Sequence, residues 1–269
     1  MLREFLPSRI DILFFRENGY WIAPKLFDEG VLSEACEHME MIYRGEHDKG
    51  EAPFKHYRDW HENPGCLRKT DNSWWADSVM TQFATSPLLG HIAALLLGVE
   101  EIYLWHDQML YKPAHSAEAN IGWHQDKAYW ATSSTTDMIT AWVAFEDVNE
   151  ANGCMRVVPG SHRWGLLNEN DGFNQDLEGQ RSRMHLPEGA VWKEVPLTMK
   201  AGQVSFHHCM TVHGSGPNVT SKPRRSIAVH LMSGEARLVK GKGHYNEMVF
   251  GGEDGQLFRG PRFPRLWPT

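Results

Sequence analysis

The hydrophobic period of this 269-residue chain changes near Glu101, and this change constrains the fold more than any other feature. Before it, apolar residues recur every three or four positions, as between Leu32 and Tyr43, which is typical of amphipathic helices. After it, short runs alternate apolar with polar residues and are rich in β-branched and aromatic side chains, which is typical of strands. Helices followed by many short strands predict an α+β fold. We expect a double-stranded β-helix (jelly roll, cupin-like) core with the N-terminal helices packed on one sheet.

We interpret residues 1–269 as a single domain, because no repeat or linker interrupts them. A helical part covers about 1–98, the jelly-roll core about 101–235, and a C-terminal extension about 236–269. The strands expected in the core are 102–111, 121–129, 138–148, 153–158, 192–197, 203–212 and 224–232.

The helical part is expected to begin with a helix, a short strand and a second helix within 10–45. Residues 46–73 are polar and contain several turn formers, so they predict a long surface excursion. Residues 73–97 return to the helical period, which Pro87 interrupts, and Gly98 is placed to cap the last helix.

Charge and cysteine content exclude several classes of protein. A net charge of −7 gives no attraction for nucleic acid or an anionic membrane surface. The four cysteines form no Cys-x-x-Cys pair, which argues against a disulfide framework or a thiolate zinc site and fits a reducing compartment. The N-terminus lacks an apolar signal core, and no stretch approaches about 18 apolar residues. We therefore expect a cytoplasmic monomer or homodimer that acts on a small molecule.

His124 and Asp126 are the first candidates for a metal site. In an extended segment these two side chains project to the same side and Gln125 to the other. One imidazole and one carboxylate are two members of the facial triad that binds ferrous iron. Because His-x-Asp triplets are common by chance, the site needs a third ligand from elsewhere in the chain.

The expected strand 203–212 and the residue after it offer three further histidines. Alternation places His208 with the more apolar residues, so it is most simply a packed core residue, and places His207 and His213 on the other face. The small residues of Gly214–Asn218 let the end of the strand approach another group closely, which favours His213. His207 remains the alternative.

Arg224 and Ser226 share one face of the last expected strand. A guanidinium and a hydroxyl two residues apart can together bind a carboxylate. Arg225 points to the opposite face, where an ordinary surface ion pair is the simpler interpretation.

These residues and several short segments resemble the phytanoyl-CoA dioxygenase family of iron(II)- and 2-oxoglutarate-dependent oxygenases. The segments are His124-x-Asp126, His213 to Asn218 with Arg224 eleven positions after His213, Asn18-Gly19-Tyr20, His106 to Pro113, Asn152-Gly153-Cys154 and Pro159 to His162. The resemblance covers roughly residues 10–235. No single segment is specific, but their combination is.

The resemblance implies that His124, Asp126 and His213 bind Fe(II), with 2-oxoglutarate as cosubstrate and O2 as oxidant. Related halogenases have a small residue in place of the carboxylate, so the presence of Asp126 implies hydroxylation or another oxidation. Asn152 and His162 belong to ordinary turn sequences, for which we expect structural roles.

The resemblance also implies residues for the cosubstrate. Arg224 would bind the distal carboxylate of 2-oxoglutarate with help from Ser226. Trp142 falls where the family has a tryptophan beside the cosubstrate, and Gln108 and Lys112 lie on a strand that faces the same cavity.

The prime-substrate pocket is the least constrained part of the site. Tyr129 and Trp130 come just after the His-x-Asp pair on the same expected strand, so we expect them near the iron. Trp60 and Trp74 are candidates for a second wall. Alternatively, Trp74 and Trp75 begin a helix and pack beneath it. Aromatic walls suit a small or medium-sized molecule with an apolar or cationic part.

Two further expectations concern the surroundings of this pocket. The polar segment 163–190 is expected to be a mobile cover, because a loop of this length in a compact domain is usually a lid or disordered. Coenzyme A is disfavoured as part of the substrate, because its phosphates need more positive charge than Lys55, Arg58, Arg68 and Lys69 provide.

Two other functional classes compete with an oxygenase. A catalytically silent jelly-roll binding protein would have lost one of the three ligands, and all are present. A zinc hydrolase needs a positioned general base, which no Glu or Asp at motif spacing supplies, and has no use for the Arg224 and Ser226 pair. Within the oxygenase class, desaturation or epoxidation remains an alternative to hydroxylation.

Overall fold

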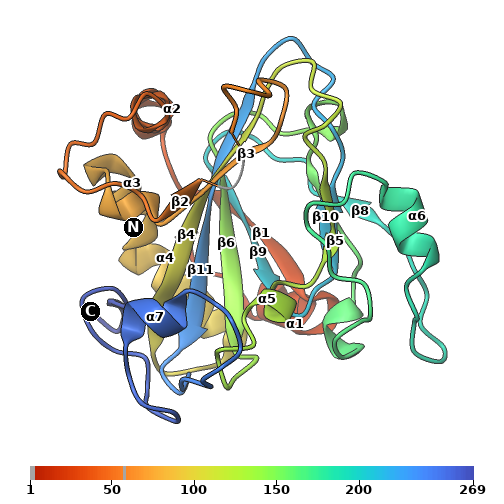
Figure 1. The fold of residues 1–269 in the computed structure, drawn as a ribbon. Helices are drawn as coiled ribbons and strands as arrows, with labels where there is room; N and C mark the ends of the chain where they lie inside the picture. Colours follow the sequence, from red (N-terminus) through yellow and green to blue (C-terminus); the bar gives the residue numbers. More distant parts are fainter. Residues whose placement is uncertain (1–3, 57–58) are drawn as a thin grey trace.

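The computed structural model describes residues 4–56 and 59–269, which form two antiparallel sheets with helices outside them (Figure 1). The larger sheet consists of β1 (Tyr20–Lys25), β2 (Lys55–His56), β3 (Arg68–Asp71), β4 (Ile102–Lys112), β6 (Met138–Ala144), β9 (Gln203–His208), β11 (Arg224–Ser233) and β12 (Arg265–Trp267). The smaller sheet consists of β5 (Ile121–His124), β7 (Met155–Val157), β8 (Val195–Pro196) and β10 (His213–Ser215).

The helices are α1 (Arg9–Asn18), α2 (Glu29–Tyr43), α3 (Ser78–Ala84), α4 (Pro87–Leu97), α5 (Asp126–Tyr129), α6 (Leu177–Ser182) and α7 (Asn246–Phe250), with short 3-10 turns at Ser73–Trp75, Glu150–Asn152 and Ser161–Arg163. The strand order is β1-β9-β6-β11-β4-β3-β2 in the larger sheet, with β12 paired to β4, and β5-β10-β7-β8 in the smaller one. This arrangement confirms the α+β class.

The N-terminal helices begin and end at capping residues. Ser8 and Asp11 form a capping box at the start of α1, and Ser86 accepts a hydrogen bond from the backbone of Leu89 at the start of α4. Gly98 adopts a left-handed conformation with φ of 74°, which confirms it as the cap that closes α4.

The larger sheet has one face on the helices and one toward the smaller sheet. On β11, Ile227, Val229 and Leu231 are fully buried in the core formed with the helices. Arg224 and His230 lie on the opposite face, where they line an internal cavity. The alternation expected for this strand is confirmed, and it separates the packed core from the functional cavity.

The structure differs from several of the expected element boundaries, and three of these differences bear on the site. The second strand stops at His124, and helix α5 begins at Asp126 instead of continuing the strand to Tyr129. The run expected as 203–212 ends at His208, and a turn leads to β10 in the other sheet. The excursion at 46–73 contributes β2 and β3, which pair with each other and extend the larger sheet from β4.

The C-terminal extension is an integral part of the fold. β12 pairs with β4, and Phe258 and Phe263 pack around Trp105 in a hydrophobic cluster. The buried amide of Asn246 donates a hydrogen bond of 2.9 Å to the carbonyl oxygen of Trp105. These contacts bring residues 242–245 to the wall of the cavity.

Ser78–Leu97, which spans α3 and α4, is long and apolar enough to cross a membrane by length and composition alone. This differs from our expectation that no stretch comes near that limit. In this fold 56% of its apolar window is buried inside the molecule, as in a core helix, which passes the same test.

Candidate active site

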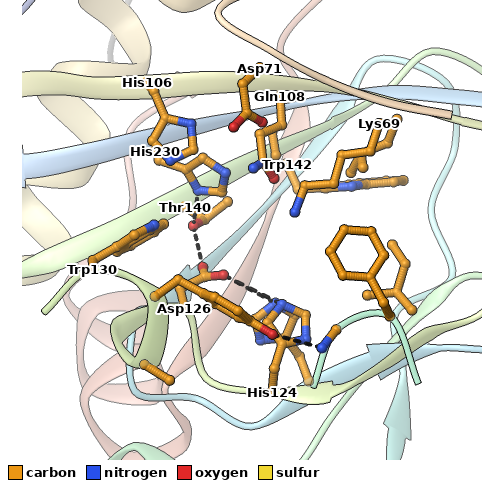
Figure 2. A pocket seen from close by; sticks show the side chains of 18 of the residues that line it. Lys69, Asp71, His106, Gln108, His124, Asp126, Trp130, Thr140, Trp142 and His230 are labelled. Carbon is orange, nitrogen blue, oxygen red and sulfur yellow. Dashed lines mark hydrogen bonds and ion pairs between the residues drawn. The ribbon is translucent and has the colours of Figure 1, made fainter. Parts of the chain in front are cut away.

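A cavity of about 640 Å³ lies between the two sheets. Its wall combines side chains from both sheets, from α5, from Gly172 and Phe173, and from residues 242–245. Figure 2 shows Asp126 and His124 on one side of this space and the larger-sheet residues His230, Gln108 and Trp142 on the other. Segments far apart in sequence therefore meet at one site.

His124, Asp126 and His213 lie together at this cavity. Their ligand atoms are all within 4.8 Å of one another. Asp126 Oδ1 is 3.6 Å from His124 Nε2 and 3.7 Å from His213 Nε2. The Cα atoms of His124 and His213 are direct partners in β5 and β10, so the register of the smaller sheet sets the two imidazoles side by side.

The three side chains fit a divalent metal ion. The Nδ1 atoms of His124 and His213 lie 2.8 and 2.9 Å from the carbonyl oxygens of Gly122 and Thr211, so each Nδ1 carries the donated proton. Each Nε2 is then free to coordinate a metal, an arrangement usual for metal-binding histidines. Burial lowers the pKa of His213 well below its usual range, so this imidazole is neutral. Two imidazoles and a carboxylate form the donor set of the facial triad.

His213 reaches the cavity from a different strand than His207, and not by alternation along one strand as we expected. The amide of Thr211 bonds to the carbonyl oxygen of His208 in a turn, and the chain then enters β10. His207 and His213 both reach the cavity, but from different sheets. His207 Nε2 is 3.3 Å from Asp126 Oδ2, outside the three-residue group. His208 contacts His162 instead, with ring centroids 5.6 Å apart.

Gln125 explains why the strand ends where it does. Its buried amide donates hydrogen bonds of 2.8 Å to the carbonyl oxygens of Gly165 and Met210. Its side-chain oxygen accepts a hydrogen bond of 2.8 Å from the amide of Leu167. The side chain thus points away from the cavity, as expected, while Asp126 turns toward it at the start of α5.

Arg224 is a charged group in the wall at the end of the cavity that Trp142 also lines. It is 2% exposed, and its guanidinium lies 5.0 Å from the ring centroid of Trp142. Burial lowers the pKa of Arg224 to about 10, so it remains charged at neutral pH. Arg224 donates a hydrogen bond of 3.0 Å to Ser226 Oγ, so the hydroxyl orients the arginine. Arg225, on the other face, pairs with Glu146 at 2.6 Å.

Gln108 and Lys112, both on β4, have different environments. Gln108 lines the cavity. The Lys112 amine donates to Ser215 Oγ at 2.7 Å and to the carbonyl oxygen of Gly216, and it is absent from the described residues that line the cavity. The Lys112 amine therefore links β4 to the segment after His213, and a contact of Lys112 with the cosubstrate stays a prediction.

Two of the four aromatic wall residues are where we expected them. Tyr129 and Trp130 line the cavity, although they come from α5 and its end and not from a strand. Trp60 packs against Tyr43, with ring centroids 4.9 Å apart. Trp74 is buried in the helix-facing core, as is Trp75. Trp60 and Trp74 were therefore wrong as substrate contacts, and the alternative that Trp74 and Trp75 pack beneath the helix is correct.

Other expectations about the surroundings have mixed outcomes. Lys55 and Lys69 line the cavity. Arg68 instead lies 4.5 Å from the ring centroid of Tyr111, and Arg58 is outside the described residues. Within 163–190, Gly172 and Phe173 reach the cavity. Asn152 and His162 make local or backbone contacts, as expected for structural residues.

Sequence reasoning missed several cavity residues, among them Asp71, His106, Thr140, His230, His244 and Tyr245. His230 lies on the face of β11 that we expected for Arg224 and Ser226, but no sequence signal indicated a role for it. The signal for His244 and Tyr245 was absent, because they belong to an extension that has no expected strand or motif.

A second group of potential ligands, His38, Asp48 and Asp77, lies among the helices. Asp77 accepts hydrogen bonds from the amides of Val79 and Met80 at the start of α3. Asp48 accepts bonds from Ser78. These carboxylates cap a helix, so we assign them a structural role.

Comparisons with known proteins agree with this geometry. Residues 15–226 match the family model described as phytanoyl-CoA dioxygenase. Human peroxisomal phytanoyl-CoA dioxygenase is 28% identical over 255 residues, which cover 88% of this chain and 71% of that protein. A probable alpha-ketoglutarate-dependent hypophosphite dioxygenase of Stutzerimonas stutzeri is 28% identical over 210 residues, covering 76% and 70%.

Among solved structures, the epimerase SnoN in complex with Fe3+, alpha-ketoglutarate and nogalamycin RO is 25% identical and superimposes with a TM-score of 0.71. The match covers 96% of this chain and 97% of that one. The family match extends over most of the chain and includes every residue of the three-ligand group. The chain belongs to the phytanoyl-CoA dioxygenase family and is an Fe(II)- and 2-oxoglutarate-dependent dioxygenase.

Proposed function

We propose that His124, Asp126 and His213 hold the Fe(II) of this dioxygenase and that Arg224 binds the distal carboxylate of 2-oxoglutarate. The observation that carries the proposal is the convergence of three ligand atoms within 4.8 Å at the same cavity that Arg224 lines. Three protein ligands leave positions for the keto acid and for oxygen, which a two-histidine, one-carboxylate site requires.

The protein's own contribution is positioning and exclusion of water. Bound Fe(II) supplies the activation of O2 that drives oxidative decarboxylation of 2-oxoglutarate to succinate and CO2. Arg224, which donates a hydrogen bond to Ser226 and lies beside the ring of Trp142, would hold the distal carboxylate of the cosubstrate. The carbonyl oxygens of Gly122 and Thr211 fix the two imidazoles. Tyr129, whose ring centroid is 5.8 Å from that of His124, and Phe173 line the same cavity.

We propose hydroxylation of a small or medium-sized organic metabolite as the reaction. A cavity of about 640 Å³ is large enough for such a molecule beside the cosubstrate. Among the described residues of its wall, Lys55, Lys69 and Lys242 stand against one acidic residue outside the ligand set, Asp71. This charge suits a neutral or acidic molecule better than the cationic one that aromatic residues alone suggested. The outcome could also be desaturation or epoxidation, which the same site supports.

Several coarser expectations join this proposal. We propose that the two facing sheets form a double-stranded β-helix within one domain, that the protein is cytoplasmic, and that it is a monomer or homodimer. All three ligands of the expected metal site lie together at the cavity, which argues against a silent binding protein.

The experiment is a substrate screen that pairs carboxylic acids with the amides and amines of the same carbon skeleton. Succinate formation and oxygen uptake are measured with Fe(II) and 2-oxoglutarate, and Asp126→Ala is the inactive control. We expect substrate-stimulated succinate formation by the wild-type protein, with acids or amides preferred to amines. Absence of any 2-oxoglutarate turnover would favour the silent protein, and a preference for amines would overturn the charge argument.

A further inference from the structure

Four side chains form one row across the cavity face of the larger sheet. The Cα of Thr140 on β6 is paired with that of His207 on β9 and with that of His230 on β11. His230 is paired in turn with His106 on β4. Residues directly opposite each other in antiparallel strands project to the same face. All four line the cavity, so the row lies across from the metal-binding group.

Thr140 connects this row to Asp126. The Thr140 hydroxyl is 2.7 Å from Asp126 Oδ2 and also 2.7 Å from His230 Nδ1 (Figure 2). Thr140 is 1% exposed and His230 is 4% exposed, so water does not compete for these contacts. The other carboxylate oxygen, Oδ1, is the one nearest the Nε2 atoms of His124 and His213. The two oxygens of Asp126 therefore have separate partners.

The direction of the hydrogen bonds follows from the number of protons. A threonine hydroxyl has a single proton, and the Asp126 carboxylate can only accept. The hydroxyl therefore donates to Oδ2 and accepts from His230, whose Nδ1 must carry the proton. Burial lowers the pKa of His230 to about 3, so the imidazole is neutral and this one tautomer is present at neutral pH.

We propose that Thr140, itself oriented by His230, is a positioning residue that holds Asp126 Oδ2 away from the metal and turns Oδ1 toward it. This inference rests on the proposed metal site. A carboxylate free to rotate can bind a metal through both oxygens, which would occupy a position needed by the cosubstrate or by oxygen. The hydrogen bond to Oδ2 opposes that rotation.

The packing around His230 supports a fixed orientation. Its ring lies 4.8 Å from that of Trp130, edge to face, and 4.5 Å from that of His106. His230 is therefore held between aromatic rings while its Nδ1 points at Thr140. Hydrogen-bonded groups behind a metal ligand typically change metal affinity by about 10- to 100-fold when removed.

The test measures Co2+ binding to the metal-free protein, because it needs neither substrate nor turnover. Thr140→Val replaces the hydroxyl by a methyl group of the same shape, and we expect Co2+ affinity to fall about 10- to 100-fold. The visible Co2+ spectrum should change as well, because the carboxylate geometry changes. Thr140→Ser keeps the hydroxyl and should restore both. Thr132→Val is the matched control, since Thr132 is fully buried and its hydroxyl has no hydrogen-bond partner among the described residues.

The role of His230 is tested by substitutions in the wild-type protein and in the Thr140→Val variant. His230→Leu alone should weaken Co2+ binding less than Thr140→Val, and His230→Asn, which keeps a donor near the same place, should recover part of the loss. In the Thr140→Val background, His230→Leu should add nothing, because its effect passes through the hydroxyl. A further loss in that background would remove His230 from the proposal.

The outcomes separate this inference from the metal site itself. If Asp126→Ala loses Co2+ but Thr140→Val binds it as the wild type does, the positioning role of Thr140 is wrong and the site stands. If Asp126→Ala binds Co2+ normally, the proposed metal site is wrong. Melting temperatures of all variants are measured without metal. If Thr140→Val does not fold, Thr140→Ser decides the test. The proposal requires a normal Co2+ affinity and a normal Co2+ spectrum of Thr140→Ser.

Discussion

His207 and His213 lie close together at the cavity, but we propose only His213 as a metal ligand. Their ring centroids are 4.4 Å apart, yet only His213 belongs to the group of three potential ligands. His213→Ala should abolish 2-oxoglutarate turnover and ferrous-ion binding, because it removes one of three ligands. His207→Ala should retain metal binding, measured by anaerobic titration with Fe(II). The reverse pattern would identify His207 as the ligand.

Arg224 and Arg225 are a natural pair for testing the cosubstrate site. Arg224→Ala leaves a buried carboxylate without its partner, so the 2-oxoglutarate requirement should rise by a factor equivalent to about 2–5 kcal/mol. Arg225→Ala breaks a partly exposed pair with Glu146 on the helix-facing side and should have a much smaller effect. The measurement is the KM for 2-oxoglutarate at fixed Fe(II), and equal effects would contradict the assignment of faces.

The sequence predicts the positions of some site residues but not of others. Arg224 could be placed because one strand's alternation determines its face. Thr140 could not, because its role depends on pairing between strands that are distant in sequence. Lys112 follows the alternation but is drawn to Ser215 and Gly216 by their hydrogen-bonding groups.

At the scale of elements, the turn after His208 and the start of α5 decide the site. Both interrupt a strand that the pattern alone continues, and each is fixed by contacts with other segments. The amide of Gln125 binds the carbonyl oxygens of Gly165 and Met210, and such tertiary contacts leave no local sequence signal. Arg68–Asp71 became a strand for the same reason, because β4 provides an edge that the local polar sequence does not reveal.

The side chain of Tyr129 is one of the links between α5 and the segment 163–190. The Tyr129 hydroxyl accepts a hydrogen bond of 2.7 Å from the amide of Gly172 and donates one of 3.0 Å to the carbonyl oxygen of Asn170. Tyr129→Phe removes both, at a cost of about 1 kcal/mol each. Hydrogen exchange near residues 170–173 should become faster, and the KM of the prime substrate should rise while substrate-free decay of 2-oxoglutarate persists. Unchanged exchange would show that this contact does not hold the segment.

Replacing Trp74 should change the stability of the protein and not substrate binding. Because it lies in the helix-facing core, Trp74→Ala should lower the free energy of unfolding by about 3–5 kcal/mol. The KM for substrate should stay unchanged in the folded fraction. Chemical denaturation and steady-state kinetics measure the two effects, and a raised KM with normal stability would return Trp74 to the substrate wall.

In the whole molecule the active-site cavity lies between two sheets, and the sequence predicts only part of this arrangement. The change of hydrophobic period predicts the helical layer and the strand-rich core. The C-terminal extension had no expected strand or site residue, yet it contributes Tyr245 to the cavity and β12 to the larger sheet. Its role could not be predicted because closure of the cavity depends on how distant segments pack.

The central claim is that one metal ion and 2-oxoglutarate share the site formed by His124, Asp126, His213 and Arg224. The most direct measurement is a crystal structure with Mn2+ and 2-oxoglutarate, with anomalous diffraction used to locate the metal. We predict one anomalous peak bound by the Nε2 atoms of the two histidines and by Asp126 Oδ1, with the distal carboxylate of 2-oxoglutarate on Arg224. A metal bound by His207 in place of His213, or a cosubstrate that does not contact Arg224, would contradict this account.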